Sequence, residues 1–175
     1  MSHAPLPNRR SIRLPGYDYT FPTAYFITIL TWQRKPVLGT VIDHAIQLSE
    51  TGTLAQREWL RLAQRFTQLE LDEFVVMPDH VHGILLLKDV KNTQYTGANT
   101  PDGSPSRPHV VPGSLGAIVR AYKSTVARLV NFSRFSDGEP FWQRNYFERV
   151  VSDERDIERI REYIRSNPLN WPKES

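Results

Sequence analysis

The chain of 175 residues contains no cysteine. This absence excludes disulfide bonds, thiolate zinc sites and cysteine nucleophiles. No apolar run approaches the roughly 18 to 20 residues that a membrane-spanning helix requires. Residues 1–13 also carry no apolar stretch after their charges, so we expect no signal peptide. These absences predict a cytoplasmic protein without a membrane segment.

Glycine is scarce as well, with 9 residues against 13 prolines, which speaks against a flexible repeat or linker protein. The hydrophobic fraction of 39% is enough for one buried core in a chain of this length. Lysine and arginine number 22 against 19 acidic residues, a net charge of +3. A mildly basic chain favours an anionic partner without requiring one. We therefore expect a single domain over residues 21–175.

Two segments contain few apolar side chains that a core could bury. Residues 1–20 contain Arg9, Arg10 and Arg13 against one acid, Asp18, and predict a basic arm. Such an arm is either a solvated tail or a contact to a phosphate backbone, and the sequence leaves both readings open. Residues 88–113 are rich in proline, glycine, serine, threonine and asparagine and show no apolar period. They predict a long flexible insertion, to which we assign no function.

The rest of the chain alternates between strand and helix patterns. Runs of β-branched and aromatic residues predict strands at 24–32, 69–77 and 81–87 and a fourth within 141–151. Only Pro78 and Asp79 separate the second strand from the third, which predicts a tight antiparallel hairpin. Apolar residues at helical spacing predict helices over 51–66, 114–131 and 154–166. After a turn near Lys35, only a short pairing or turn segment is indicated. This order predicts an α+β fold in which helices pack on an antiparallel sheet.

The residues with the clearest chemistry lie at the start of the third strand, in the sequence MPDHVHG (residues 77–83). Side chains alternate along a strand, so His80 and His82 share one face, with Cα atoms roughly 7 Å apart, while Val81 faces the core. Such a pair can hold one divalent cation. Without cysteine the site needs oxygen ligands, which suits Mg²⁺ or Mn²⁺ better than structural zinc. We interpret Asp79 mainly as a turn residue.

The last helix carries a second set of polar groups. Ile157, Ile160 and Ile164 form its apolar stripe, Tyr163 flanks the stripe, and Asn167 follows one turn later on the same side. Taken alone, these two polar residues are typical of a core boundary and a helix end. Next to a metal-binding histidine pair they gain another interpretation, because a phenol can attack a phosphate that a metal polarises.

Four sequence segments together carry a family resemblance. The chain resembles the REP-associated tyrosine transposases, chromosomal relatives of the insertion-sequence single-tyrosine transposases within the HUH endonucleases. The resemblance covers residues 9–171 apart from the 88–113 insertion. It is carried by RRSIRLPGY, the His-hydrophobic-His motif MPDHVHG, FWQRNYFERVV and YIRSNPLNW.

The resemblance implies both a fold and a mechanism. It implies a ferredoxin-like, or RRM-like, antiparallel sheet with the histidine pair on a central strand. It further implies that His80, His82 and Asn167 bind Mg²⁺ or Mn²⁺ and that Tyr163 is the nucleophile. The implied reaction cleaves single-stranded DNA near a hairpin and leaves a 5′-phosphotyrosine link and a free 3′-hydroxyl. Tyr122 and Tyr146 are rival nucleophiles, but each has a valine, not an amide, four residues on.

The same residues predict contacts to DNA. Arg120, Lys123 and Arg128 lie on a predicted helix without acids, and with the N-terminal arginines they offer phosphate contacts. Trp142 could stack on an unpaired base or belong to the core. We expect hairpin-bearing single-stranded DNA as the partner, no small-molecule substrate, and a monomer or homodimer. Two alternatives stay open: a non-catalytic DNA- or RNA-binding regulator on the same fold, and a phosphodiesterase that uses water.

Overall fold

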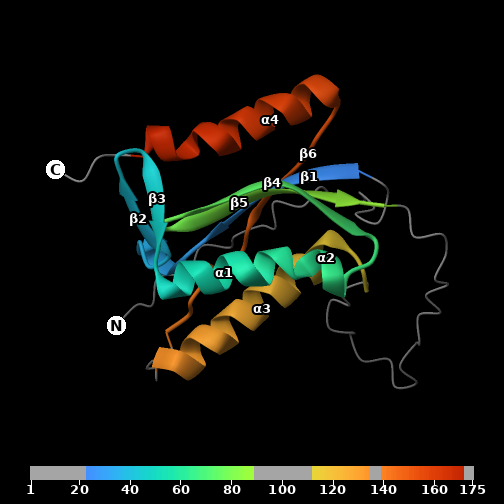
Figure 1. Ribbon diagram of the computed structural model, residues 1–175. Coiled ribbons are helices and arrows are strands. Elements are labelled where there is room, and N and C mark those ends of the chain that lie inside the picture. Colours follow the sequence, from blue (N-terminus) through green and yellow to red (C-terminus); the bar gives the residue numbers. More distant parts are fainter. Residues whose placement is uncertain (1–22, 89–111, 135–138, 172–175) are drawn as a thin grey trace, which may run out of the picture.

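The computed structural model describes residues 23–88, 112–134 and 139–171 (Figure 1). The predicted basic arm, with Arg9, Arg10 and Arg13, lies outside the described residues, and so does most of the predicted insertion. The division into arm and domain therefore stays a prediction. None of the helices in the described ranges is long and apolar enough to cross a membrane.

A four-stranded antiparallel sheet forms the centre of the molecule. Its strand order is β4 (Leu69–Met77), β5 (His80–Leu87), β1 (Thr23–Leu30) and β6 (Phe147–Val150). The helices are α1 (Glu50–Leu60), α2 (Leu62–Arg65), α3 (Leu115–Arg134) and α4 (Glu154–Ser166). Two short 3₁₀ helices, η1 (Trp32–Arg34) and η2 (Asn167–Asn170), and a separate hairpin of β2 (Gly39–Ile42) and β3 (Ala45–Leu48) complete the described elements.

The order β1–α1–β4–β5–α3–β6 is the β-α-β-β-α-β arrangement of ferredoxin-like folds. The α+β fold predicted from the sequence is thereby confirmed. The two faces of the sheet are covered differently: Figure 1 shows α1 and α3 on one face and α4 alone on the other. Because α4 follows β6, it is an addition to the βαββαβ unit.

The larger core lies between the sheet and the helices α1 and α3. Trp59 of α1 and Val81 and Leu85 of β5 are among its buried members. Gly83 permits this packing, because a Cβ at that position would lie 2.3 Å from the Trp59 ring. The smaller core, under α4, consists of Phe26, Ile84, Val151, Ile160 and Ile164.

Several element boundaries differ from the predictions. The first strand ends at Leu30, not at residue 32, because the chain turns into η1 at Trp32, where Gln33 and Arg34 have positive φ. The helix predicted over 51–66 breaks at Arg61, whose N–H is shared between the carbonyls of Arg57 and Trp59. The basic helix continues to Arg134. The region after η1 forms a true hairpin.

Candidate active site

His80 and His82 lie at the start of β5, which is flanked on both sides by other strands. Their ring centroids are 4.3 Å apart, so the structure brings the two imidazoles together on one face of the sheet, as the strand periodicity predicts. This is the face that α4 covers. Each histidine is only 6% exposed.

Asp79 fixes the orientation of the His80 imidazole. Its Nδ1 lies 2.5 Å from Asp79 Oδ1, and Arg34 Nε donates to the other carboxylate oxygen at 2.9 Å. Burial alone raises the pKa of the Asp79 carboxyl, but hydrogen bonds from His80 and Arg34 outweigh it and hold this pKa below its ordinary value. Asp79 is therefore more than the turn residue that the sequence predicts. It does lie in the turn, and there, ahead of the regular strand, its side chain can reach the ring of His80.

The imidazole of His82 has a matching support from β1. Its Nδ1 lies 2.8 Å from the hydroxyl of Thr28, its cross-strand partner, and its ring stacks on Phe26. Burial, reinforced by the nearby His80, lowers the pKa of His82 to about 3. The ring is therefore neutral at physiological pH, the state in which a histidine can bind a metal ion or accept a hydrogen bond.

The phenol of Tyr163 reaches this pair from α4. Its hydroxyl lies 3.3 Å from His82 Nε2, and the two ring centroids are 5.3 Å apart. The Tyr163 side chain is 49% exposed, so it touches the histidines on one side and solvent on the other. Phe26 packs edge-on against the ring and fixes its inner side. The hydroxyl is thus accessible to a substrate while the ring is held in place.

The two histidines fit the binding of a divalent cation. Because each Nδ1 has a hydrogen-bond partner, each ring is left with Nε2 for the site. His80 Nε2 is buried and has no hydrogen-bond partner in the described residues, an arrangement that a ligand would relieve. Within the same ranges, no three His, Asp or Glu side chains gather to hold a metal. Amide, water and substrate oxygens are the further ligands that such a site can use.

Asn167, the predicted third ligand, lies where α4 ends. It begins η2 with helical φ and ψ, so it continues α4 and lies one turn beyond Tyr163 on the same side. In the described part of the chain, no hydrogen bond joins its side chain to His80 or His82. The ring of Trp171, just after η2, lies 6.0 Å from that of His80.

The sequence interpretation missed Thr28, Phe26 and Trp171 as parts of the site. Period-2 alternation puts Phe26 and Thr28 on one face of their strand, and this signal was present in the sequence. The register that places Thr28 opposite His82 is not readable from either strand alone.

The rival tyrosines lie elsewhere. Tyr122 is buried between the sheet and α1, where its hydroxyl donates to the carbonyl of Ala55, in line with the expected core position. Tyr146 packs against the larger core, on the opposite side of the sheet from the histidines. Of the three tyrosines considered, Tyr163 is the one that the fold brings to the histidine pair.

Two of the residues predicted as DNA contacts are engaged within the protein. Trp142 is 5% exposed and packs against Tyr122 and Phe141, so it belongs to the core and cannot stack on a base. The ammonium of Lys123 donates to three backbone carbonyls, those of Gln143, Arg144 and Asn145. Burial lowers the pKa of Lys123 to about 8. Lys123 therefore holds the segment before β6 in place, and its ammonium is not directed at a phosphate.

Arg120 and Arg128 are exposed, as a phosphate contact requires. They lie on α3, however, and α3 covers the sheet face opposite to the one that carries His80, His82 and Tyr163 (Figure 1). These two arginines and the candidate site therefore cannot contact the same phosphate.

One match by sequence and one by structure are informative. No protein-family model matches the chain. An uncharacterised protein of Haemophilus influenzae is 33% identical over 178 residues, which span 98% of this chain and 94% of the relative. The chain belongs to the same family as that protein. A solved structure of a REP-associated tyrosine transposase bound to a REP hairpin has a TM-score of 0.62 at 15% identity, over 93% of this chain and 77% of that one. The chain has the fold of this transposase.

The resemblance drawn from the sequence motifs is thus confirmed at the level of the fold. Within this transposase fold, the histidine pair, Thr28 and Tyr163 come from three different elements: β5, β1 and α4. Sequence identity to the Haemophilus protein adds family membership but no activity, because the name of that protein states none.

Proposed function

We propose that the chain is a metal-dependent transposase that cleaves and rejoins single-stranded DNA next to hairpin elements through a covalent phosphotyrosine. The observation that carries the proposal is the position of the half-exposed Tyr163, whose hydroxyl lies 3.3 Å from His82 Nε2. The transposase fold and the motifs MPDHVHG and YIRSNP support it.

In the proposed reaction Tyr163 is the nucleophile. Its phenolic oxygen forms a bond to phosphorus, the bond from phosphorus to the 3′-oxygen breaks, and that oxygen leaves as a free 3′-hydroxyl. The exchange replaces one phosphate ester by another, so no ATP is needed, and a 3′-hydroxyl can reverse the step and rejoin strands.

The residues around Tyr163 hold the reacting groups. Asp79 and Thr28 orient the two imidazoles so that both Nε2 atoms face the site. A divalent cation such as Mg²⁺ or Mn²⁺, held by His80, His82 and the Asn167 amide, would polarise the scissile phosphate and offset its developing charge. Phe26 limits the positions that the phenol ring can take. His82 Nε2 can be a metal ligand or accept a hydrogen bond from Tyr163, but it cannot do both at once.

The hairpin partner is proposed from the solved structure that shares this fold. The transposase that shares this fold was solved bound to a REP hairpin, and we propose a hairpin-bearing DNA for this chain as well. Exposed Arg120 and Arg128 are candidates for contacts to duplex phosphates away from the cleaved strand.

The proposal is tested by incubating the protein with labelled hairpin oligonucleotides and Mn²⁺ and separating the products on a denaturing gel. We expect a covalent protein–DNA adduct that is abolished by Tyr163→Phe and kept by the control Tyr146→Phe. Binding without an adduct across a panel of hairpins would contradict the proposal and favour a non-catalytic regulator. Cleavage that survives Tyr163→Phe would contradict it in another way, because water would then be the nucleophile.

A further inference from the structure

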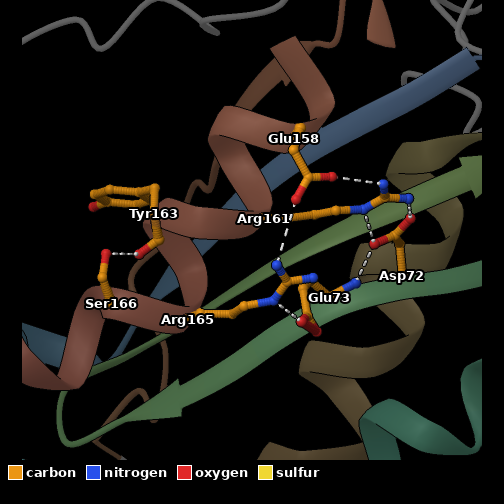
Figure 2. A network of polar contacts seen from close by, with 7 residues as sticks. All are labelled: Asp72, Glu73, Glu158, Arg161, Tyr163, Arg165 and Ser166. Atoms are coloured by element: carbon orange, nitrogen blue, oxygen red, sulfur yellow. Dashed lines mark hydrogen bonds and ion pairs between the residues drawn. The ribbon is translucent and has the colours of Figure 1, made fainter. Parts of the chain in front are cut away.

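The helix that carries Tyr163 is held to the sheet by ion pairs along one flank. Arg161 of α4 makes a two-pronged contact with Asp72 of β4, with distances of 2.9 Å and 2.6 Å. Arg165, one turn later, donates to Glu73 at 2.5 Å, and Glu158 bridges both arginines at 3.1 Å and 3.4 Å. Figure 2 shows these five side chains as one network between α4 and β4, with the Tyr163 ring directed away from it.

An irregularity in β4 makes the network possible. The register between β4 and β5 shifts between Leu71 and Phe74, so Asp72 and Glu73 both stand opposite Ile84. In a regular strand, two successive side chains would point to opposite faces of the sheet. The bulge instead lets both carboxylates reach α4. Asp72 is further fixed because its Oδ1 accepts the backbone N–H of Glu73 at 2.6 Å.

Arg161 and Asp72 are well suited to hold a fixed orientation. The exposed fractions of their side chains are 31% and 13%, so the pair is largely shielded from water. The hydrogen bond from Arg161 is the main cause that keeps the pKa of the Asp72 carboxyl below its ordinary value. A planar guanidinium with two bonds to one carboxylate also fixes an angle, which a single contact does not.

The network and the phenol lie on opposite flanks of the helix. At about 100° per residue, Tyr163 is about 160° away from both Arg161 and Arg165 around the helix axis. Between the two flanks, Ile160 and Ile164 rest on the small core under α4. Apolar contacts of this kind permit a helix to roll, whereas ion pairs on one flank resist it. A roll of about 20° would move a side-chain tip roughly 5 Å from the axis by about 2 Å.

We propose that the ion pairs of Asp72 with Arg161 and of Glu73 with Arg165 are a positioning device that sets the rotation of α4 and thereby holds Tyr163 against His82. The inference rests on the proposed function, in which Tyr163 is the nucleophile. Misplacing a nucleophile by about 1 Å can reduce a rate about a hundredfold. Breaking a largely shielded pair also lowers the free energy of unfolding, and urea denaturation measures that loss separately from the rate of adduct formation. The two effects can therefore be separated by experiment.

The test compares Arg161→Gln with Arg155→Gln, a matched control on the exposed side of the same helix. At saturating hairpin DNA and Mn²⁺, we expect Arg161→Gln to slow adduct formation in a single turnover by tenfold or more. The dissociation constant for DNA should change less than threefold, and Arg155→Gln should match the wild type. Reversing the pair, with Asp72→Arg and Arg161→Asp combined, should restore part of the rate.

A second measurement is independent of catalysis. With 3-fluorotyrosine incorporated, the ¹⁹F resonance of Tyr163, assigned by its loss in Tyr163→Phe, reports the surroundings of the ring. We expect Arg161→Gln, or Asp72→Asn if the first variant does not fold, to shift it toward the value of the unfolded chain. An unchanged resonance in a folded variant would overturn the inference, even if no adduct forms in any sample. An adduct rate within twofold of the wild type would overturn it as well.

Discussion

At the scale of single residues, the candidate site depends on what lies behind each imidazole. Asp79 and Thr28 occupy the two Nδ1 atoms, so both Nε2 atoms face the site. That His80 and His82 share a face could be predicted, because alternation along a strand is a local property. That Asp79 orients the His80 ring could not be predicted, because its other partner, Arg34, lies 45 residues earlier in the chain.

Asp79→Asn should weaken the binding of Mn²⁺. An amide is a poorer acceptor for the N–H of His80 and has no charge to attract Arg34, so the ring would lose its fixed orientation. Removing a comparable partner behind a metal ligand reduces metal affinity by about 10- to 100-fold. Titration of Mn²⁺ followed by electron paramagnetic resonance measures this change. Asp43→Asn, in the exposed turn between β2 and β3, is the matched control. Equal affinity of the Asp79 variant and this control would show that Asp79 does not orient a metal ligand.

Gly83→Ala should destabilise the fold. The added methyl would lie 2.3 Å from the buried ring of Trp59, so either the ring or strand β5 must move. Overpacking of this kind costs about 1–3 kcal/mol in the free energy of unfolding, which urea denaturation measures. Combined with Trp59→Leu, which makes room, the alanine should cost clearly less than it does alone. Additive losses would mean that the two side chains do not collide.

At the scale of elements, the bounds of α4 can be predicted from the sequence, whereas its contacts with the sheet cannot. Its bounds follow from the capping residue Asp153 and the stripe of isoleucines, and both were visible in the sequence. The bulge in β4 and the ion pairs that fix α4 depend on strand register, so they could not be seen in the sequence. The short exposed hairpin of β2 and β3 gave only a weak pattern, because few of its residues are buried.

The start of α4 should make stability depend on pH in acid. Asp156 is buried, and the backbone N–H of Ser152, together with Arg149, holds the pKa of its carboxyl below the ordinary 3.8. Its stabilising effect is therefore complete above pH 3.8 and is lost as the pH falls through the lower pKa of the folded state. Melting temperatures measured from pH 6 to pH 2 should fall less steeply for Asp156→Asn than for the wild type. Parallel curves for the two proteins would contradict this account.

At the scale of the whole molecule, the sheet separates two surfaces. Tyr163 and the histidines lie on the face under α4, and the exposed Arg120 and Arg128 lie on α3 beyond the opposite face. The sequence predicted the fold class and the basic helix, because both follow from periodicity and composition. It did not predict that the basic helix and the candidate site lie on different faces, because this depends on which face each helix covers.

Replacing both Arg120 and Arg128 by glutamine should therefore change the affinity for hairpin DNA but not the rate of adduct formation. If both arginines bind phosphates, hairpin affinity falls and its dependence on salt weakens, by about one unit of slope for each arginine replaced. The rate of adduct formation at saturating DNA should stay within twofold of the wild type, because neither arginine reaches the site. Fluorescence anisotropy at several salt concentrations and single-turnover gels measure the two quantities. A lower rate at saturation would place these arginines at the cleaved phosphate.

The central claim is that Tyr163 attacks DNA, and mapping the site of the adduct tests it most directly. The candidate tyrosines fall on different tryptic peptides: Tyr163 on EYIR, Tyr122 on AYK and Tyr146 on NYFER. After reaction with a hairpin oligonucleotide and Mn²⁺, nuclease treatment and trypsin digestion, mass spectrometry should find the nucleotide attached to EYIR. A nucleotide attached to another peptide, or cleaved DNA without any modified peptide, would contradict the account.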